Sequence, residues 1–386
     1  MNSVSEESSN MRVVNRFVDH GPPLSFRELC ARLVEDGYDY VLLDLDKTTH
    51  LGRNLGELLA WELCAYEAYG DSETEERPVR RWFGGRLLLD WSQPMKMTRY
   101  LASGAQRWAL AGIHYLVWGK LASRIPPLGR LAYRRFGPHP TSEVQRLPQK
   151  VALAHLATAD DSLLRELARR VWRRQAPDQV ISREDLDWVR ARCPDVEIIL
   201  CSASPKPMLE VAVEELGADR AIYSTPERIN SGKAKIEELR RICPRAFDPD
   251  VNVLAITDTS YCEDHCWNEH FACVVDINSP TPFPPIVSQA SPTRAVHSAT
   301  VLTREEQRRR NDADMGYLDP RRKHRGSAAM VELDGATLRK RLGDLLHEVN
   351  RVAARKPSPP QWEVAHALNQ LFGSSRTALN TAVKTG

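Results

Sequence analysis

The stretch "YDYVLLDLDKTTHLG", residues 38–52, runs from an apolar segment directly into two carboxylates, Asp44 and Asp46. The apolar run 41–43 is typical of an interior parallel strand that is covered on both faces. The two carboxylates would then point to the same side at the carboxyl end of that strand, where open α/β sheets bind ligands. Because like charges this close repel each other, the pattern indicates a divalent cation with oxygen ligands. A capped turn after the strand is the structural alternative.

Further strands and helices alternate later in the chain. Segments 206–217 and 232–243 have apolar residues at helical intervals, and they separate strand-like runs at residues 195–203, 220–225, 251–259 and 271–278. This order predicts an α/β fold with a doubly wound, Rossmann-like parallel sheet that binds ligands at its carboxyl edge. A helix is expected before the first strand, within residues 23–37.

A long insertion separates the first two predicted strands, where a simple crossover takes a dozen or more residues. Segments 55–70, 105–122 and 160–176 show helical spacing. We therefore expect a large helical cap at residues 55–189 that closes over the site and excludes water. The catalytic core would comprise residues 23–54 and 190–285.

The two ends of the chain differ from this core in composition. Residues 1–22 are expected to form a disordered N-terminus, and residues 286–330 a charged linker. Residues 331–386 are expected to form a helical C-terminal extension, with an apolar stripe that includes Leu338 and Leu342. The basic run 321–325 is weak evidence for an anion or nucleic acid, so specific nucleic-acid binding is not expected.

The composition of the 386 residues, 42% of them hydrophobic, indicates a globular protein with a substantial core. Lys plus Arg number 53 and Asp plus Glu 51, so the net charge indicates no particular partner. The opening "MNSVSEESSN" lacks a basic and then apolar leader, and no uncharged run approaches the ~18 residues of a membrane span. We therefore expect a cytoplasmic protein whose eight cysteines are reduced thiols.

One group of cysteines invites a second interpretation, a zinc site. Cys262, Cys266, His270 and Cys273 have spacings that fit one helical face. Structural zinc sites usually take ligands from two separate segments, because a single helix closes a tetrahedron poorly. Ordinary packing thiols are therefore favoured here.

Polar side chains of a useful kind follow each later strand. Ser202 and Ser204 end the second strand, and Lys233 and Lys235 open a helix after the third. The fourth ends at Asp258, with Glu263 and Asp264 close behind. Carboxylates, a hydroxyl and an ammonium at one sheet edge suit phosphoryl transfer. Singly, each has an ordinary alternative as a helix cap, a surface cation or a turn residue.

These residues carry a resemblance. "DLDKT" (44–48), Ser202 in "IILCSAS", Lys235 in "GKAKIEEL" and Asp258 in "ITDTSYCED" resemble the four ordered motifs of the haloacid dehalogenase superfamily of phosphatases. The resemblance covers only residues 38–60 and 195–280. "SASP" with the segment after it is similar to the branch that contains phosphoserine phosphatase, whose helical cap is inserted after the first motif.

The resemblance implies a role for each matching residue. Asp44 would be the nucleophile that forms an aspartyl-phosphate, and Asp46 the general acid. Mg²⁺ would be held by the Asp44 carboxylate, the Asp46 backbone carbonyl and Asp258. Ser202 and Lys235 would hold the phosphoryl oxygens, and Thr48 would help to orient the nucleophile and bind phosphate.

Two departures from the family pattern leave alternatives open. Thr257 stands where the family has a glycine, and Cys262 stands where its second acid is expected, so Glu263 or Asp264 must support the site, with Asp264 preferred. The expected function is Mg²⁺-dependent hydrolysis of a phosphomonoester. A phosphotransferase of the same superfamily and a catalytically silent scaffold protein are the alternatives.

The cap segment 91–142 has eight Lys or Arg residues and no Asp or Glu. Its run "WALAGIHYLVWG" is too short to span a bilayer but suits a membrane interface. Contact with an anionic membrane or a phosphorylated, lipid-like substrate is one interpretation of this pattern. The favoured alternative is that Trp108, Ile113, Leu116 and Val117 form the core of the cap.

Overall fold

The structure is a computed structural model of the 386-residue chain. It describes residues 11–33, 37–70, 79–82, 85–88, 93–99, 102, 113–122, 125–136, 149–260, 264–279, 285–311 and 331–334.

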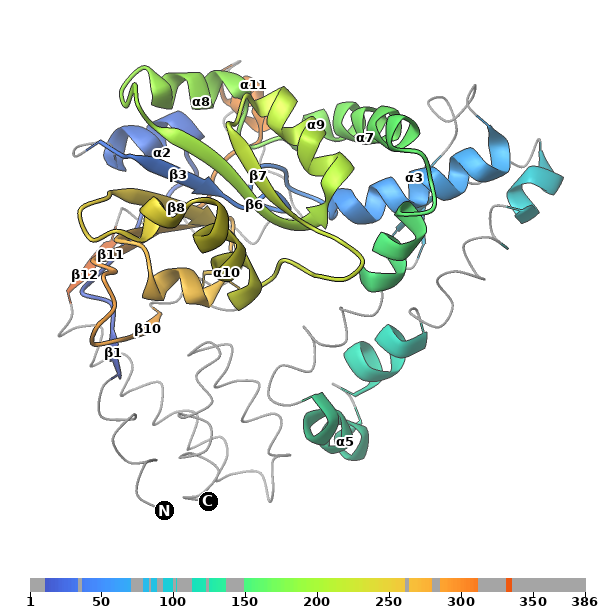
Figure 1. The fold of residues 1–386 in the computed structure, drawn as a ribbon, viewed down its shortest axis with the longest axis horizontal. Coiled ribbons are helices and arrows are strands. Elements are labelled where there is room, and N and C mark those ends of the chain that lie inside the picture. Colours follow the sequence, from blue (N-terminus) through green and yellow to red (C-terminus); the bar gives the residue numbers. More distant parts are fainter. Residues whose placement is uncertain are drawn as a thin grey trace.

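The centre of the fold is a sheet with seven parallel strands in the order β2-β11-β9-β8-β3-β6-β7 (Figure 1). A short strand, β12, pairs antiparallel with β2 at one edge. The strands are β2 (Arg16–Asp19), β3 (Tyr40–Leu43), β6 (Glu197–Pro205), β7 (Arg220–Ser224), β8 (Val253–Thr257), β9 (Cys273–Ile277), β11 (Ala295–Ala299) and β12 (Val331–Asp334).

Strand β3 lies in the interior of this sheet, between β8 and β6, and its side chains are apolar on both faces. Val41 and Leu43 belong to the buried cluster on one face, and Tyr40 and Leu42 to the cluster on the other. Alternate residues of a strand point to opposite faces, so an unbroken apolar run suits a strand that is covered twice. The prediction of an interior parallel strand before Asp44 is confirmed.

Helices cover both faces of the sheet (Figure 1). Those of the larger cluster are α2 (Phe26–Leu33), α3 (Leu55–Tyr69), α7 (Asp161–Gln175), α8 (Arg183–Arg190) and α9 (Lys206–Leu216). Helix α10 (Lys233–Ile242) contributes Ile236 and Leu239 to the cluster on the other face. The helices expected before the first strand, at the two ends of the insertion and between the later strands are confirmed.

The expected ends of the core are wrong in three places. Residues 11–19 form β1 (Met11–Val13) and β2 and are not a disordered start. The expected charged linker contains β10 (Ile286–Ser288), β11 and α11 (Arg304–Asn311), and β11 is buried inside the sheet. Residues 331–334 form β12, where a helical extension was expected; the predicted amphipathic helix and the basic run 321–325 lie outside the described residues.

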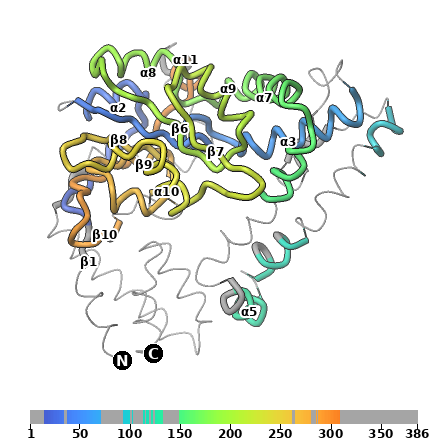
Figure 2. Tube along the Cα trace, viewed as in Figure 1, coloured from blue at the N-terminus to red at the C-terminus, as the bar shows by residue number. Residues whose placement is uncertain are grey.

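The inserted segment begins and ends within the core layer. Helices α3 and α7 contact each other, and both contribute to the cluster beneath the sheet. The cap therefore begins after α3 and ends before α7, inside the expected limits 55–189. Its described elements include the hairpin of β4 (Val79–Trp82) and β5 (Gly85–Leu88), the helix η3 (Tyr115–Leu121) and α5 (Pro126–Phe136). Figure 2 shows the chain leaving the sheet layer after α3 and returning before α7.

Among the described residues, no helix is long and apolar enough to cross a membrane.

Candidate active site

The carboxyl ends of three adjacent strands bring the predicted site residues together. Asp44 follows β3, Ser202 lies near the end of β6, and Asp258 follows β8 directly. Because β6 and β8 flank β3 in the sheet, these residues share one edge. Lys235 reaches this edge from the first turn of α10.

A buried lysine joins two of the acids. Lys235 Nζ lies 3.1 Å from Asp44 Oδ1 and 2.9 Å from Asp264 Oδ2, and its side chain is only 4% exposed. Lys233, two residues earlier, is exposed. Of the two lysines, only Lys235 therefore lies on the helix face that is turned toward Asp44.

Asp264 is held by two hydroxyl groups as well as by the lysine. Thr257 Oγ1 donates a hydrogen bond of 2.8 Å to Asp264 Oδ2, and Thr259 Oγ1 lies 3.3 Å from the same oxygen. Thr257 therefore has a local structural function, since it anchors the Asp264 carboxylate. Asp264 is fully buried at the edge where the second acid is expected; Glu263 lies outside the described residues.

Asp46 is held separately, at the start of α3. Its Oδ1 accepts a 2.6 Å hydrogen bond from the Leu55 amide, and its Oδ2 accepts bonds from Asn54 Nδ2 at 3.0 Å and Ser204 Oγ at 2.7 Å. Asn54 also caps this helix, because its Oδ1 accepts from the Glu57 amide. A helix N-terminus favours a negative charge, so these contacts fix the direction of the Asp46 carboxyl.

A glycine lets α3 approach β6 closely enough for these bonds to form. A Cβ at Gly56 would lie 2.4 Å from Pro205 Cδ and 3.0 Å from Ser204 Oγ. The proline ring is rigid, so any side chain at this position would push the helix start away from Ser204 and Asp46.

The turn after β3 carries backbone strain. Lys47 has a φ of 63°, in the left-handed region that residues other than glycine rarely adopt. The side chain of Thr48 is fully buried, and its Oγ1 has no hydrogen-bond partner within the described residues. An orphaned hydroxyl of this kind fits a ligand oxygen, but no contact orients Asp44 through Thr48 among the described residues.

The two serines of "CSAS" differ in their partners. Ser204 Oγ binds Asp46, whereas Ser202 Oγ accepts a 3.1 Å bond from the Ser204 amide. Ser202 is almost completely buried beside the end of β3. The hydroxyl hydrogen of Ser202 is not used in that bond, and Ser204 directs the Asp46 carboxyl through a contact that the sequence alone did not indicate.

Burial dominates the electrostatics of this edge. It raises the pKa of Asp44 to about 7, although Lys235 acts in the opposite direction. Burial also raises the pKa of Asp46, against the hydrogen bonds from Ser204 and Leu55. The pKa of Asp258 lies well above its ordinary value because of burial and the nearby Asp44. Asp44, Asp46, Asp258 and Asp264 thus share one site. Among the described residues, Lys235 is the buried cation at this site.

This excess of acids fits a divalent metal ion. Within the described residues, no hydrogen bond or ion pair is found for Asp258, and Asp264 Oδ1 has no partner although it is buried. Carboxylate oxygens from Asp44 and Asp258, together with a main-chain carbonyl, are ligands that Mg²⁺ prefers. The site residues therefore fit the ion that the resemblance implies.

The structure gives no support to a zinc site at Cys262, Cys266, His270 and Cys273. Cys262 lies outside the described residues, and Cys266, His270 and Cys273 do not form a set of three within reach of one ion. Burial raises the pKa of Cys266 to about 12 and that of Cys273 to about 11, as expected for packed thiols.

No protein-family model matches this chain, and no curated protein matches it significantly. The function is therefore inferred from the parallel sheet and from the arrangement of the site residues at its edge.

Sequence reasoning missed Asn54, Ser204 and the two threonines as supporting residues. A signal was present for Asn54, because Asn54 and Glu57 have the spacing of a helix N-cap. No sequence signal indicated Thr257 and Thr259, because their contacts depend on where Asp264 folds back after β8.

Proposed function

We propose that this protein is a Mg²⁺-dependent phosphatase that hydrolyses a phosphomonoester through an aspartyl-phosphate. The proposal rests on one observation: Asp44 and Asp46, separated by one residue, are held by different partners. Asp44 contacts the buried Lys235, whereas Asp46 is directed by Ser204, Asn54 and the start of α3. This difference supports a role for Asp44 in attack and a role for Asp46 in proton transfer.

In the first step an Asp44 carboxylate oxygen forms a bond to phosphorus as the bond to the leaving oxygen breaks. Asp46 donates its proton to that oxygen, and its raised pKa favours the protonated form that this step needs. In the second step Asp46 takes a proton from water, whose oxygen attacks phosphorus. Phosphate leaves and the Asp44 carboxylate is restored.

The remaining site residues bind the transferred group. Ser202 and Thr48 have hydroxyls suited to phosphoryl oxygens, and Lys235 offsets their charge. Asp44, the Asp46 main-chain carbonyl and Asp258, supported by Asp264, would hold Mg²⁺. When bound, the ion supplies positive charge that stabilises the phosphoryl group in the transition state.

The direct test is phosphate release from an aryl phosphate by the full chain. We expect release with Mg²⁺, loss of release with EDTA, and recovery when Mg²⁺ is added back. An added alcohol distinguishes the phosphotransferase, because a transferase would form the alkyl phosphate faster than it releases phosphate. Absence of both products across a panel of phosphorylated metabolites and phospholipids would contradict the proposal and favour the scaffold alternative.

Replacement of Ser204 by alanine should impair proton transfer more than binding. The change removes the 2.7 Å hydrogen bond that directs Asp46. We expect kcat to fall about 10-fold on an alkyl phosphate and much less on a nitrophenyl phosphate, whose leaving group needs little acid help. KM should stay nearly constant. An equal loss on both substrates would show that Ser204 does not act through Asp46.

We also propose that the cap binds an anionic lipid surface, where the protein would meet its substrate. The exposed large hydrophobic residues of the described chain all lie in the cap: Met95, Ile113, Leu116, Ile125 and Leu131. Ile113 is 58% and Leu116 47% exposed, which contradicts the expectation that they form the cap core. Trp108 of that expectation lies outside the described residues, and Val117 is half-buried.

Positive charge accompanies this apolar surface. Lys96, Arg99 and Arg130 are exposed, and the sequence 91–142 has no acidic residue. Helices η3 and α5, which carry Leu116 and Leu131, contact each other. Apolar side chains beside cations bind anionic membranes, at about 1 kcal/mol for each cation near the surface.

Sedimentation with liposomes tests this surface. We expect binding to vesicles with phosphatidylglycerol, no binding to pure phosphatidylcholine vesicles, and weakening by salt. Replacement of Leu116 and Leu131 by serine, with Arg130→Glu, should abolish binding, whereas Arg192→Glu, just after α8 in the core, should not. Equal sedimentation with both vesicle types would remove the membrane proposal and leave the phosphatase proposal untouched.

A further inference from the structure

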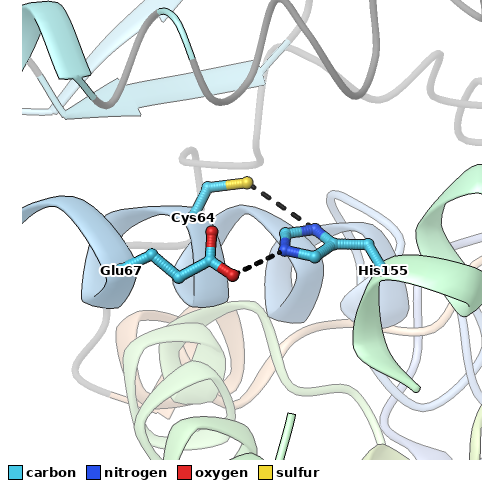
Figure 3. Close-up of side chains that lie close together, drawn as sticks. All are labelled: Cys64, Glu67 and His155. Carbon is cyan, nitrogen blue, oxygen red and sulfur yellow. Dashed lines mark hydrogen bonds and ion pairs between the residues drawn. The ribbon is translucent and has the colours of Figure 1, made fainter. Parts of the chain in front are cut away.

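Three side chains that ligate metals meet at the base of the inserted segment, outside the aspartate site (Figure 3). Cys64 and Glu67 lie one turn apart on α3, and His155 lies on the helix at residues 149–156. His155 Nδ1 lies 3.8 Å from Cys64 Sγ, and His155 Nε2 lies 3.1 Å from Glu67 Oε1. One ligand atom from each residue lies within 4.8 Å of the other two.

The chemistry of this group selects among ions. A thiolate, an imidazole and a carboxylate are the ligands that zinc accepts, whereas Mg²⁺ requires oxygen. Bonds of about 2.3 Å to sulfur and about 2.1 Å to nitrogen or oxygen separate tetrahedral ligands by roughly 3.5 Å. Cys64 Sγ and Glu67 Oε1 contact opposite nitrogens of the His155 ring, so a shared ion requires Glu67 to turn toward the nitrogen that faces Cys64. The side chain of Glu67 is 31% exposed and has room for this movement.

We propose that Cys64, Glu67 and His155 bind Zn²⁺ and occupy three positions of a tetrahedral site. On binding, the thiol of Cys64 loses its proton to solvent and forms a bond from sulfur to the ion. The hydrogen bond between Glu67 and His155 is exchanged for bonds to the same ion. Cys64 and His155 are both buried, so a nucleophilic role toward an outside substrate does not fit. Water would take the fourth position of the tetrahedron.

The site lies where a metal clamp has a structural effect. Helix α3 leads into the cap, and the helix at 149–156 leads out of it. A shared ion ties these two segments together at the exit and re-entry of the chain. The same α3 begins at the Leu55 amide that holds Asp46. The inference does not depend on the proposed phosphatase activity.

Cobalt substitution tests the site in the full chain. Co²⁺ bound to a thiolate gives a sulfur-to-cobalt charge-transfer band in the near ultraviolet, which the oxygen ligands of the aspartate site cannot give. We expect this band at one equivalent of Co²⁺, its displacement by Zn²⁺, and its loss in Cys64→Ser. The band should persist in Asp258→Ala, in Cys30→Ser, and in Cys266→Ser with His270→Gln.

A variant at a partly exposed residue keeps the test valid even if Cys64→Ser fails to fold. Glu67→Gln changes a partly exposed residue and should weaken Zn²⁺ binding at least about 10-fold in competition with a chelator dye. Zn²⁺ should also raise the Tm of the wild-type chain and not that of Cys64→Ser. Absence of the band in folded wild-type protein, its persistence in Cys64→Ser, or unchanged Zn²⁺ affinity in Glu67→Gln would each overturn the proposal.

Discussion

Asp44→Asn is expected to lower phosphate release by about 10⁴-fold or more while the protein stays folded. The change removes the attacking oxygen and one ligand of the ion but almost no volume. Lys235 keeps its ion pair with Asp264 when Asp44 becomes an amide, and the buried amide has no charge to desolvate. The Tm should therefore change little, and the loss should appear in kcat.

Two measurements make this result specific. Asp195→Asn, at an exposed position in the loop before β6, should keep full activity. Acid-quenched protein should carry labelled phosphate in Asp46→Asn when the leaving group is good, and none in Asp44→Asn. Substantial turnover in Asp44→Asn would contradict the covalent mechanism.

Lys235→Met is expected to remove activity and to destabilise the protein by about 3–5 kcal/mol. Lys235 is the buried cation between Asp44 and Asp264, at 3.1 Å and 2.9 Å. Without it, two buried carboxylates lose their common partner, and desolvation opposes their charge. Urea unfolding in EDTA measures this loss without a contribution from bound metal.

A double-mutant cycle separates the ion pair from packing. Asp264→Asn removes one of the two acids, so Lys235→Met should cost clearly less in that background. Lys235→Arg should not restore activity, because the planar guanidinium cannot take the place of a compact ammonium between two acids. Equal costs in the wild-type and Asp264→Asn backgrounds would show that Lys235 and Asp264 do not stabilise each other.

The strands that carry the site were predictable because each is a short apolar run that ends in a polar residue. Residues 40–43, 197–205 and 253–257 form adjacent parallel strands as expected, and their ends bring Asp44, Ser202 and Asp258 to one edge. In a parallel sheet all carboxyl ends face the same way, so the strand order alone placed these side chains near each other.

The edge strands were not predictable from local pattern. β2 and β11 are short and contain charged or polar residues, and they pair with each other from opposite ends of the chain. The burial that makes each of them a strand comes from that distant partner. The residues next to β2 and β11 in the sequence therefore predict only a polar N-terminal segment and a charged linker.

By itself, the sequence determined the parallel α/β class and the polar residues at the strand ends, because strand periodicity and the order of strand ends are local properties. The choice of Lys235 over Lys233, the support of Asp264 by Thr257, and the meeting of Cys64 with His155 were decided by the tertiary structure. Each depends on which face of a helix or loop turns toward a partner that is distant in sequence. That direction is set by the packing of whole elements against the sheet, which no single segment encodes.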